Sequence, residues 1–230
     1  MKSVRPTRLA LAGHFAGDGS VSSCRRRLEV FTMDLDTAVG YKRHFGGTNT
    51  RHGKGWRWRS DPSRFDETVG FMAPHAWTKS AQLRRVAGVK RWTPELKAEL
   101  QDLKRTEDPT STDVPVSGTE MDQVVAGFLT ADGHTRSYGK SHRASVVFTQ
   151  KKPGVLEVIK AHYPGGRIYR FNPKCSGRTH NVNGEMYEAH RLVFNGSPAY
   201  AILNRLFPFI ASGRVRSRAE KVLVMHELNL

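Results

Sequence analysis

Apolar positions along the chain follow two periods, and the helical one is clearest in two nonapeptides, residues 11–19 and 125–133. In both segments small residues recur at i, i+3 and i+4, which leaves one face of each predicted helix nearly bare: Ala12, Gly13, Ala16 and Gly17 in the first, and Ala126, Gly127, Thr130 and Ala131 in the second. Two such faces can pack backbone against backbone. Both segments end in Asp-Gly, and a glycine in the left-handed conformation is expected to end each helix. The pattern therefore predicts that Asp18 and Asp132 come close together.

The rest of the first half alternates between strand and helix periods. Thr7 is expected to cap the first helix, and Gly46-Gly47 to end the second. Strands are predicted over 20–23 and 28–33, a hairpin over 48–60, and helices over 36–45, 64–72, 78–86 and 92–103. Within the hairpin, Trp56 and Trp58 alternate with arginines, which predicts tryptophan on one face of a sheet and arginine on the other.

The second half repeats this order. After the second nonapeptide and a polar stretch, the patterns predict strands over 144–149, 167–171 and 186–194 and helices over 153–162, 198–206 and 218–228. Residues 28–32 are similar to 145–149, and Gly46-Gly47 is matched by Gly165-Gly166. Repetition on this scale indicates two pseudo-equivalent subdomains related by an internal two-fold axis.

The predicted fold class is therefore α+β, with two pseudo-symmetric αββαββα subdomains that each contain an antiparallel sheet and pack through the nonapeptide helices. The N-terminal subdomain is expected over residues 1–104 and the C-terminal one over residues 119–230. Residues 105–118, rich in Pro, Ser, Thr and Asp and without periodicity, are predicted to be the linker.

The net charge of the chain indicates the class of molecule that it binds. The chain carries 37 Lys and Arg against 21 Asp and Glu, a net charge of +16, and both halves share the excess equally. Such a balance favours a polyanionic partner, with nucleic acid ahead of a membrane surface. The sequence shows no membrane span and no secretion signal, so an intracellular location is expected. Cys24 and Cys175 give no disulfide framework, and Cys175 with His180 and His190 lacks the spacing of a zinc site.

Basic residues gather on the segments that should form uncovered sheet faces. In each half one face of the sheet needs helices over it, and the other is left with basic and polar side chains. Two such faces make a saddle that fits a long stretch of double-stranded DNA, whose major groove admits strands. The candidate DNA-contacting residues are Arg25, Arg27, Arg51, Lys54, Arg57 and Arg59 in the first half, and Lys140, Arg143, Lys151, Arg167, Arg170, Lys174 and Arg178 in the second.

The two aspartates carry the candidate chemistry. Two carboxylates at adjacent helix C-termini repel each other and face the negative ends of two helix dipoles. A divalent cation relieves this repulsion, and Mg2+ prefers one or two carboxylates together with waters and substrate phosphates. Asp18 and Asp132 are therefore predicted to be metal ligands.

The nonapeptides resemble the paired motifs of LAGLIDADG homing endonucleases, in the single-chain form that carries both. Leu11-Ala-Gly opens the first and Val125-Ala-Gly the second, and Asp-Gly closes each. The sixth position, often acidic in the family, is Ala16 in one copy and Thr130 in the other. The resemblance covers nearly the whole chain. It implies an enzyme of the kind found in mobile introns, which cuts both strands of a long, partly degenerate DNA target and leaves 3′ overhangs.

The resemblance also implies roles for particular residues. Each motif acid serves one DNA strand as a Mg2+ ligand, assisted by the main-chain carbonyls of Gly17 and Ala131, and the protein acts as a monomer. Mn2+ is expected to substitute for Mg2+, and Ca2+ to bind without cleavage. A basic residue that stabilises charge at the phosphate is expected in each half. The candidates are Lys79 and Arg216, and Arg214 fits almost as well as Arg216.

Two other functions on the same fold stay open at this stage. An intron maturase would bind RNA and assist splicing, sometimes with cleavage retained, whereas a regulator would bind DNA on a decayed nuclease scaffold. Intact acids in both motifs favour the nuclease. An intein is disfavoured, because the chain lacks an N-terminal Cys or Ser and a His-Asn C-terminal junction.

Overall fold

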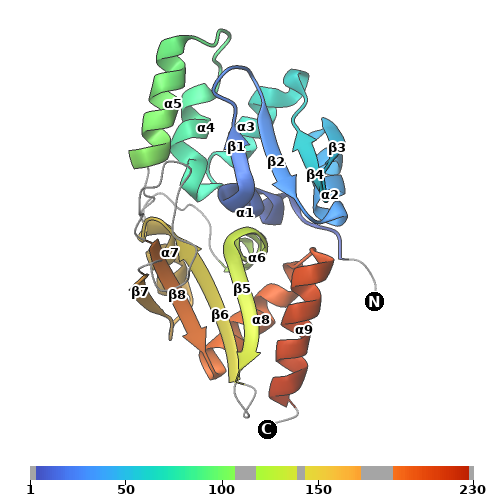
Figure 1. Cartoon of the computed structure of the whole chain (residues 1–230), viewed down its shortest axis with the longest axis vertical. Coiled ribbons are helices and arrows are strands. Elements are labelled where there is room, and N and C mark those ends of the chain that lie inside the picture. The colour runs from blue at the N-terminus through green and yellow to red at the C-terminus, as the bar shows by residue number, and fades with distance from the viewer. Residues whose placement is uncertain (1–3, 107–117, 139–142, 172–188, 228–230) are drawn as a thin grey trace.

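The chain folds into two halves of the same design. In the computed structural model, which describes residues 4–106, 118–138, 143–171 and 189–227, each half is a four-stranded antiparallel sheet with helices over one face (Figure 1). The strand orders, β1-β2-β4-β3 and β5-β6-β8-β7, are equivalent. The predicted α+β class with two pseudo-symmetric αββαββα units is therefore confirmed.

The elements of the first half follow the predicted order: α1 (Arg8–Asp18), β1 (Gly19–Val21), β2 (Leu28–Thr32), α2 (Leu35–Phe45), β3 (Thr48–His52), β4 (Gly55–Arg59), η1 (Pro62–Arg64), α3 (Phe65–Met72), η2 (Trp77–Lys79), α4 (Ser80–Val86) and α5 (Pro94–Thr106). The Thr7 hydroxyl caps α1 as predicted, accepting the Ala10 N–H at 3.1 Å. Gly46 ends α2 with a φ of 71°, the left-handed conformation that glycine adopts most easily.

The second half consists of α6 (Gly118–Asp132), β5 (Gly133–Tyr138), β6 (Arg143–Gln150), α7 (Gly154–His162), β7 (Arg167–Phe171), β8 (Ala189–Asn195), α8 (Ser197–Leu206), η5 (Phe207–Phe209) and α9 (Gly213–Glu227). Strand β5 forms where only a polar stretch was expected. Helix α9 begins at Gly213 rather than at residue 218, because the Ser212 hydroxyl accepts the Val215 N–H at 3.4 Å. Most of the predicted linker lies outside the described residues, so the subdomain boundary stays a prediction.

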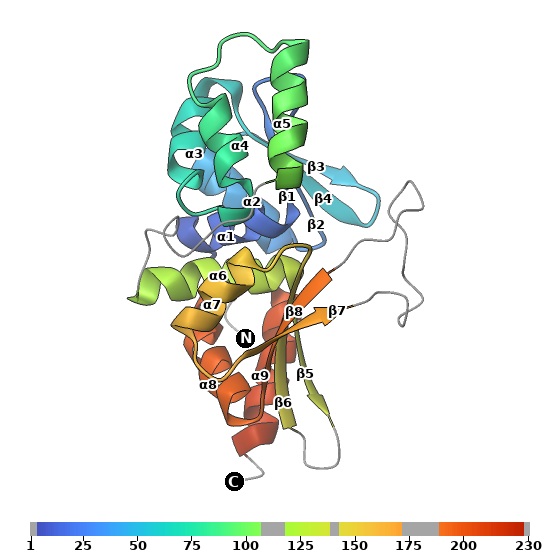
Figure 2. The same cartoon turned by 90° about the vertical axis from the view of Figure 1, so that its left-hand side faces the viewer.

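Helices α1 and α6 lie side by side at the waist of the molecule, between the two sheets (Figures 1 and 2). A Cβ atom added at Gly13 would lie 1.9 Å from the Val124 carbonyl oxygen, and one added at Gly127 would lie 1.7 Å from that of Ala10. The helices therefore touch backbone to backbone, as the small-residue pattern predicted.

The glycine that follows each motif acid has a different role from the one expected. Gly19 is extended, with φ −76° and ψ 158°, and Gly133 has no positive φ either. Each helix passes directly into the first strand of its sheet. A Cβ at Gly19 would lie 2.4 Å from the Phe15 carbonyl oxygen, and one at Gly133 would lie 2.6 Å from that of Leu129. Glycine is required because the chain folds back tightly on the last helical turn, not because of a left-handed conformation.

The core of each half lies between its sheet and its helices. Figure 2 shows both sheets on the right and α3, α7 and α8 on the left. Trp58 of β4 is buried and stacks on Tyr41 of α2 with ring centroids 4.8 Å apart, and in the second half Phe128 stacks on Phe148 at 6.1 Å. Among the described helices, none combines the length and the apolar character needed to cross a membrane.

Candidate metal centre and nucleic-acid interface

The two motif acids meet where α1 and α6 end. A Cβ at Gly17 would lie 2.7 Å from the Asp132 Oδ2, so the second carboxylate lies against the end of the first helix. Burial and, next, the charge of Asp132 raise the pKa of Asp18 to about 6, while Lys79 opposes the rise. Because 40% of the Asp18 side chain stays exposed, solvent screens part of the repulsion. Burial also raises the pKa of Asp132. The predicted proximity of the two acids is confirmed.

One basic side chain reaches the end of α1. Lys79 donates from Nζ to the Ala16 carbonyl oxygen at 2.8 Å, and the Thr78 hydroxyl donates to the same oxygen. The positive charge of Lys79 opposes the rise in pKa of both Asp18 and Asp132, so it acts on both acids. Lys79 therefore lies at the candidate centre, and its catalytic role stays a prediction.

Two cavities flank the helix pair, and each combines residues of both motifs. The larger, of about 540 Å³, contains Asp132 together with Gly17 of α1. The smaller, of about 260 Å³, contains Asp18 together with Ala131 of α6. Each acid therefore shares its cavity with a residue from the last turn of the other motif helix, and metal binding by the main-chain carbonyls of Gly17 and Ala131 stays a prediction. Carboxylate and carbonyl oxygens, completed by waters and phosphate, are a donor set that suits Mg2+.

The two cavities differ in charge. The larger is lined by five basic side chains, from η2, the end of α5 and the β6–α7 turn: Lys79, Lys104, Arg105, Lys151 and Lys152. The smaller contains one basic side chain, Arg214, together with Asp34 and the apolar side chains of Phe31 and Met33. Lys104, Arg105 and Lys152 were not predicted, because the end of α5 and the β6–α7 turn meet only in the folded chain. The larger cavity is therefore much the better suited to an anionic phosphate.

Two other side chains that contact the acids were not predicted from the sequence. Gln150, at the end of β6, donates from Nε2 to the Asp132 Oδ2 at 2.7 Å. His14, one turn before Asp18 on α1, places its Nε2 3.5 Å from the Asp18 Oδ2. The i,i+4 spacing of His14 and Asp18 was the available signal. Gln150 gave none, because its strand meets α6 only in the fold.

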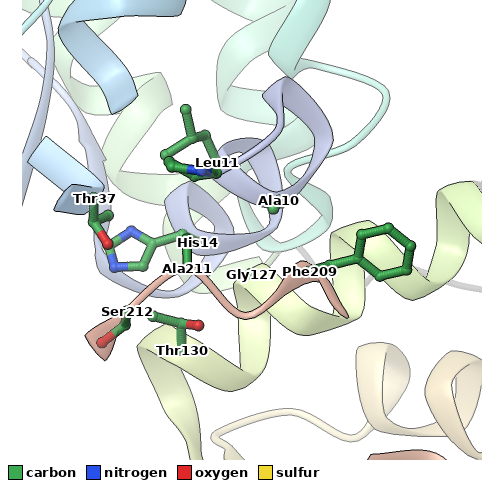
Figure 3. Close-up of a pocket in the computed structure, with 10 residues that line it drawn as sticks. Ala10, Leu11, His14, Thr37, Gly127, Thr130, Phe209, Ala211 and Ser212 are labelled. Atoms are coloured by element: carbon green, nitrogen blue, oxygen red, sulfur yellow. The ribbon is translucent and has the colours of Figure 1, made fainter. Parts of the chain in front are cut away.

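His14 is held in place at its other ring nitrogen. Its Nδ1 lies 3.2 Å from the hydroxyl of the buried Tyr41, which itself donates to the Leu11 carbonyl oxygen at 2.6 Å. His14 also lines a cavity of about 10 Å³ with Thr37 and Ser212 (Figure 3), which is room for about one water molecule. Burial lowers the pKa of His14 to about 4, against the charge of Asp34, so the imidazole is neutral at neutral pH.

The basic residue predicted for the second half has structural contacts of its own. Arg216 donates from one terminal guanidinium nitrogen to the carbonyl oxygens of Phe207 at 2.8 Å and Ile210 at 3.2 Å, and its guanidinium carbon lies 4.0 Å from the centroid of the Phe207 ring. These contacts hold the start of α9 against η5. Arg214, two residues earlier, lines the cavity of Asp18. Position therefore favours Arg214 at this cavity, and a role for Arg216 in catalysis stays a prediction.

The uncovered face of the first sheet carries part of the predicted basic set. Trp58 is buried under the helices, so Arg57 and Arg59 lie on the opposite face, as predicted. Arg51 is paired with Trp56, and this register places Arg51 on the helix side rather than beside Arg57. Arg27 lies on the segment that leads into β2, Arg25 in the loop before it, and Lys54 in the β3–β4 turn.

The second sheet shows the same division. Ala144, Val146 and Phe148 of β6 are buried, so Arg143 and its neighbours at every second position face away from the helices. The register places Arg167, and the unpredicted Arg136 and Arg191, on this uncovered face, while Arg170, paired with His190, lies on the helix side.

Three of the predicted contacts, Lys140, Lys174 and Arg178, lie outside the described residues, as do Cys175 and His180. In the part of the chain that the structure describes, no group of three or more His, Cys, Asp or Glu side chains is arranged to hold a metal ion. A cation at the waist would therefore be bound by fewer than three such side chains, with its other ligands drawn from main-chain oxygens, waters and phosphate.

The architecture and the paired acids define a class: the chain has the fold of single-chain LAGLIDADG homing endonucleases. A point mutant of I-SmaMI is 14% identical, with a TM-score of 0.63 over 99% of this chain and 93% of that one. The LAGLIDADG meganuclease I-AabMI, bound to uncleaved DNA, is 12% identical with a TM-score of 0.61 over 96% and 91%. The LAGLIDADG homing endonuclease I-GzeII, in complex with its DNA target, is 13% identical with a TM-score of 0.57 over 97% and 91%.

At this level of identity the likeness concerns the fold. I-SmaMI is also known bound to an uncleaved DNA target in the presence of calcium ions, and that structure covers 97% of this chain and 92% of its own at 14% identity and a TM-score of 0.53. The sequence matches no protein-family model, and no curated protein is significantly similar to it.

Proposed function

We propose that this chain is a site-specific endonuclease that makes double-strand breaks in a long DNA target by metal-dependent hydrolysis and leaves 3′ overhangs. The observation that carries this proposal is the meeting of Asp18 and Asp132 at the waist, between two sheets whose uncovered faces are basic. The DNA complexes of I-AabMI and I-GzeII support it through their shared fold. Because one chain supplies both acids, the enzyme would act as a monomer.

The uncovered sheet faces are proposed to bind the duplex on either side of the cut. Strands fit the major groove, where side chains at every second position reach base edges. Arg57, Arg59, Arg136, Arg167 and Arg191 lie at such positions. Arginine contacts guanine edges in pairs of hydrogen bonds, whereas basic residues in turns and at strand ends contact phosphate and supply affinity without sequence preference.

Each motif acid is proposed to serve one DNA strand. Asp18 and Asp132 would hold Mg2+, or Mn2+ in its place, together with main-chain oxygens of the other motif. A bound cation polarises the scissile phosphate and makes a water molecule nucleophilic, so no nucleophilic side chain is needed. Lys79 supplies positive charge where negative charge builds up on the phosphate. Gln150 keeps the Asp132 carboxylate oriented through its hydrogen bond. The calcium-containing complex of I-SmaMI supports the use of a divalent cation.

Cleavage selection on a randomised duplex library tests this function. With Mg2+ we expect discrete double-strand cuts with 3′ overhangs at related sequences, and with Ca2+ we expect binding without cuts, because Ca2+ does not support the hydrolysis. Sequencing of the cut ends gives the target and the overhang together. Uncut DNA at every Mg2+ and Mn2+ concentration would refute the nuclease.

Single substitutions then assign the strands. Asp18→Asn and Asp132→Asn each remove one proposed metal ligand, and each variant should nick one strand of the selected target, with the opposite strand cut in the two cases. The double variant should bind without cutting. If the double variant still cuts in a metal-dependent manner, the acids are not the metal ligands.

The same preparation separates the alternatives. Tight, salt-sensitive DNA binding without any cut would indicate a regulator, because phosphate contacts give a steep salt dependence whether or not cleavage follows. Stronger competition by structured RNA than by duplex DNA would indicate a maturase.

A further inference from the structure

We propose that His14 is a nitrogen ligand of the cation held by Asp18, so that the two metal sites of this chain differ in their chemistry. Taking Asp18 as a metal ligand rests on the nuclease function proposed above. His14 adds to that function a donor type, imidazole, which the paired acids do not provide. The consequence is a preference of one site for transition-metal ions.

The positions of the two side chains suit a shared cation. His14 and Asp18 stand one turn apart on α1, with the imidazole Nε2 3.5 Å from the carboxylate Oδ2. Metal–nitrogen and metal–oxygen bonds in such sites are about 2.1 Å long, so a separation of 3.5 Å between the two atoms is within the span of one shared ion. Both residues line the cavity of about 260 Å³, which leaves room for water or phosphate oxygens.

Hydrogen bonding determines which nitrogen of His14 faces the acid. The Tyr41 hydroxyl has a single proton, and it donates that proton to the Leu11 carbonyl oxygen. The contact of 3.2 Å between Tyr41 and His14 therefore requires an N–H on Nδ1. In the neutral tautomer with that N–H, Nε2 has a lone pair that is available to a metal ion, and it lies 3.5 Å from the Asp18 Oδ2.

A lone pair and a carboxylate that face each other call for a positive species between them. A metal ion satisfies both, and a histidine that binds metal through one nitrogen commonly donates its other N–H to a neighbouring oxygen. Tyr41 provides that oxygen. The buried hydrogen bonds from His14 to Tyr41 and from Tyr41 to the Leu11 carbonyl thus resemble the second-layer hydrogen bonds that orient a metal-binding histidine.

The second motif has no such donor. The position of His14 in the first nonapeptide corresponds to Phe128 in the second, whose ring stacks on Phe148 in the core. Asp132 instead accepts a hydrogen bond from the Gln150 amide. Mg2+ prefers an all-oxygen environment, whereas imidazole favours first-row transition metals. The site of Asp18 should therefore favour Co2+ over Mg2+ more strongly than the site of Asp132 does.

Electron spin-echo spectroscopy of bound Mn2+ tests ligation directly and needs no DNA. In an Asp132→Asn background, which isolates the site of Asp18, we expect nitrogen modulation from a coordinated imidazole. The modulation should vanish in the His14→Phe variant, in which the first motif has phenylalanine, as the second motif does at Phe128. In an Asp18→Asn background, which isolates the other site, no such modulation is expected. Bound Mn2+ without nitrogen modulation in the Asp132→Asn protein, or modulation that survives His14→Phe, would overturn the proposal.

Calorimetry separates ligation from simple positioning. In the Asp132→Asn background, His14→Phe and His14→Gln should both weaken Co2+ binding by about tenfold or more, the scale on which metal sites respond even to loss of an outer partner. Undiminished Co2+ affinity in His14→Gln would mean that His14 only positions Asp18 by hydrogen bonding. Cation binding is measured without DNA, so these experiments test the role of His14 even if the protein does not cut DNA. The cleavage assay in turn tests the nuclease even if cations bind weakly in the absence of DNA.

Discussion

The contact between α1 and α6 predicts a large effect of a very small substitution, Gly127→Ala. The added Cβ would lie 1.7 Å from the Ala10 carbonyl oxygen, whereas such contacts in folded proteins stay above about 3 Å. The oxygen belongs to a helix backbone and the Cβ is fixed rigidly to one, so neither atom can rotate away. The two helices must separate by roughly 1.5 Å, and a gap of even 0.5–1 Å forfeits a quarter to a half of the dispersion energy of the atoms that line it.

We expect Gly127→Ala to lower the free energy of unfolding by about 3 kcal/mol, the upper part of the usual range for overpacking. For a chain of this size that corresponds to a fall in melting temperature of roughly 6–12 °C. Calorimetric melting without divalent cations measures it. Separation of the helices also displaces Asp132 from Gly17, so the cleavage rate in Mg2+ should fall together with the stability.

Gly70→Ala is the matched control. Gly70 lies in α3 with an exposed surface and no atom within 4 Å of an added Cβ. The same chemical change should there raise stability by about 0.5–1 kcal/mol, because alanine is the better helix former. A Gly127→Ala protein that melts at or above the temperature of the wild type would refute the close helix contact.

Three further predictions concern single side chains. Because the pKa of Asp18 is raised to about 6 from 3.8, the folded state binds that proton more tightly than the unfolded state does, and the resulting stability is lost as the pH rises through 6. Asp18→Asn should therefore be more stable than the wild type at pH 8 without cations, with the gain falling to roughly a third at about pH 4.5 because it disappears only below the unfolded pKa; urea unfolding at the two pH values measures this, and an equal gain at both would contradict it. Gln150→Ala should slow cleavage about 10- to 100-fold on the strand assigned to Asp132 and leave the other strand unaffected, as followed with end-labelled DNA; equal slowing of both strands would argue against the assignment. Asp122→Ala removes a largely buried carboxylate that the Arg205 guanidinium contacts at 2.8 Å, and should cost about 2 kcal/mol of stability in urea unfolding while cleavage at low temperature is kept; unchanged stability would mean that the pair contributes nothing net.

Local patterns predicted most of the elements but not the relation between them. The alternation of Trp58 with Arg57 and Arg59 correctly placed tryptophan under the helices and arginine outside. Arg51 was grouped with the same arginines, but it lies on the neighbouring strand, and only the pairing of Arg51 with Trp56 shows that it is on the other side. Strand alternation fixes faces within one strand, and register between strands is a property of the tertiary fold.

The candidate site was predicted to a similar extent. Asp18 and Asp132 were found because a bare helix face and a terminal acid are both visible in nine residues. Lys79 was found through the family resemblance. His14 was not predicted, because its i,i+4 spacing from Asp18 was the only signal and spacing alone does not show that the buried ring points one nitrogen toward Asp18. Strand β5 was missed because the inward position Thr135 is polar, which hides the alternation.

Each of the two cavities is lined by residues of both motif helices, which gives a reason for both halves to be joined in one chain. Each cavity takes its acid from one motif and residues of the last helical turn from the other, so neither half alone lines a whole cavity. A protein made of one half could form such a cavity only as a dimer, at concentrations above its dissociation constant. Fusion of two copies replaces that association by an intramolecular contact with an effective concentration in the millimolar range. Two halves joined in one chain need not be identical, and here one motif carries His14 where the other carries Phe128.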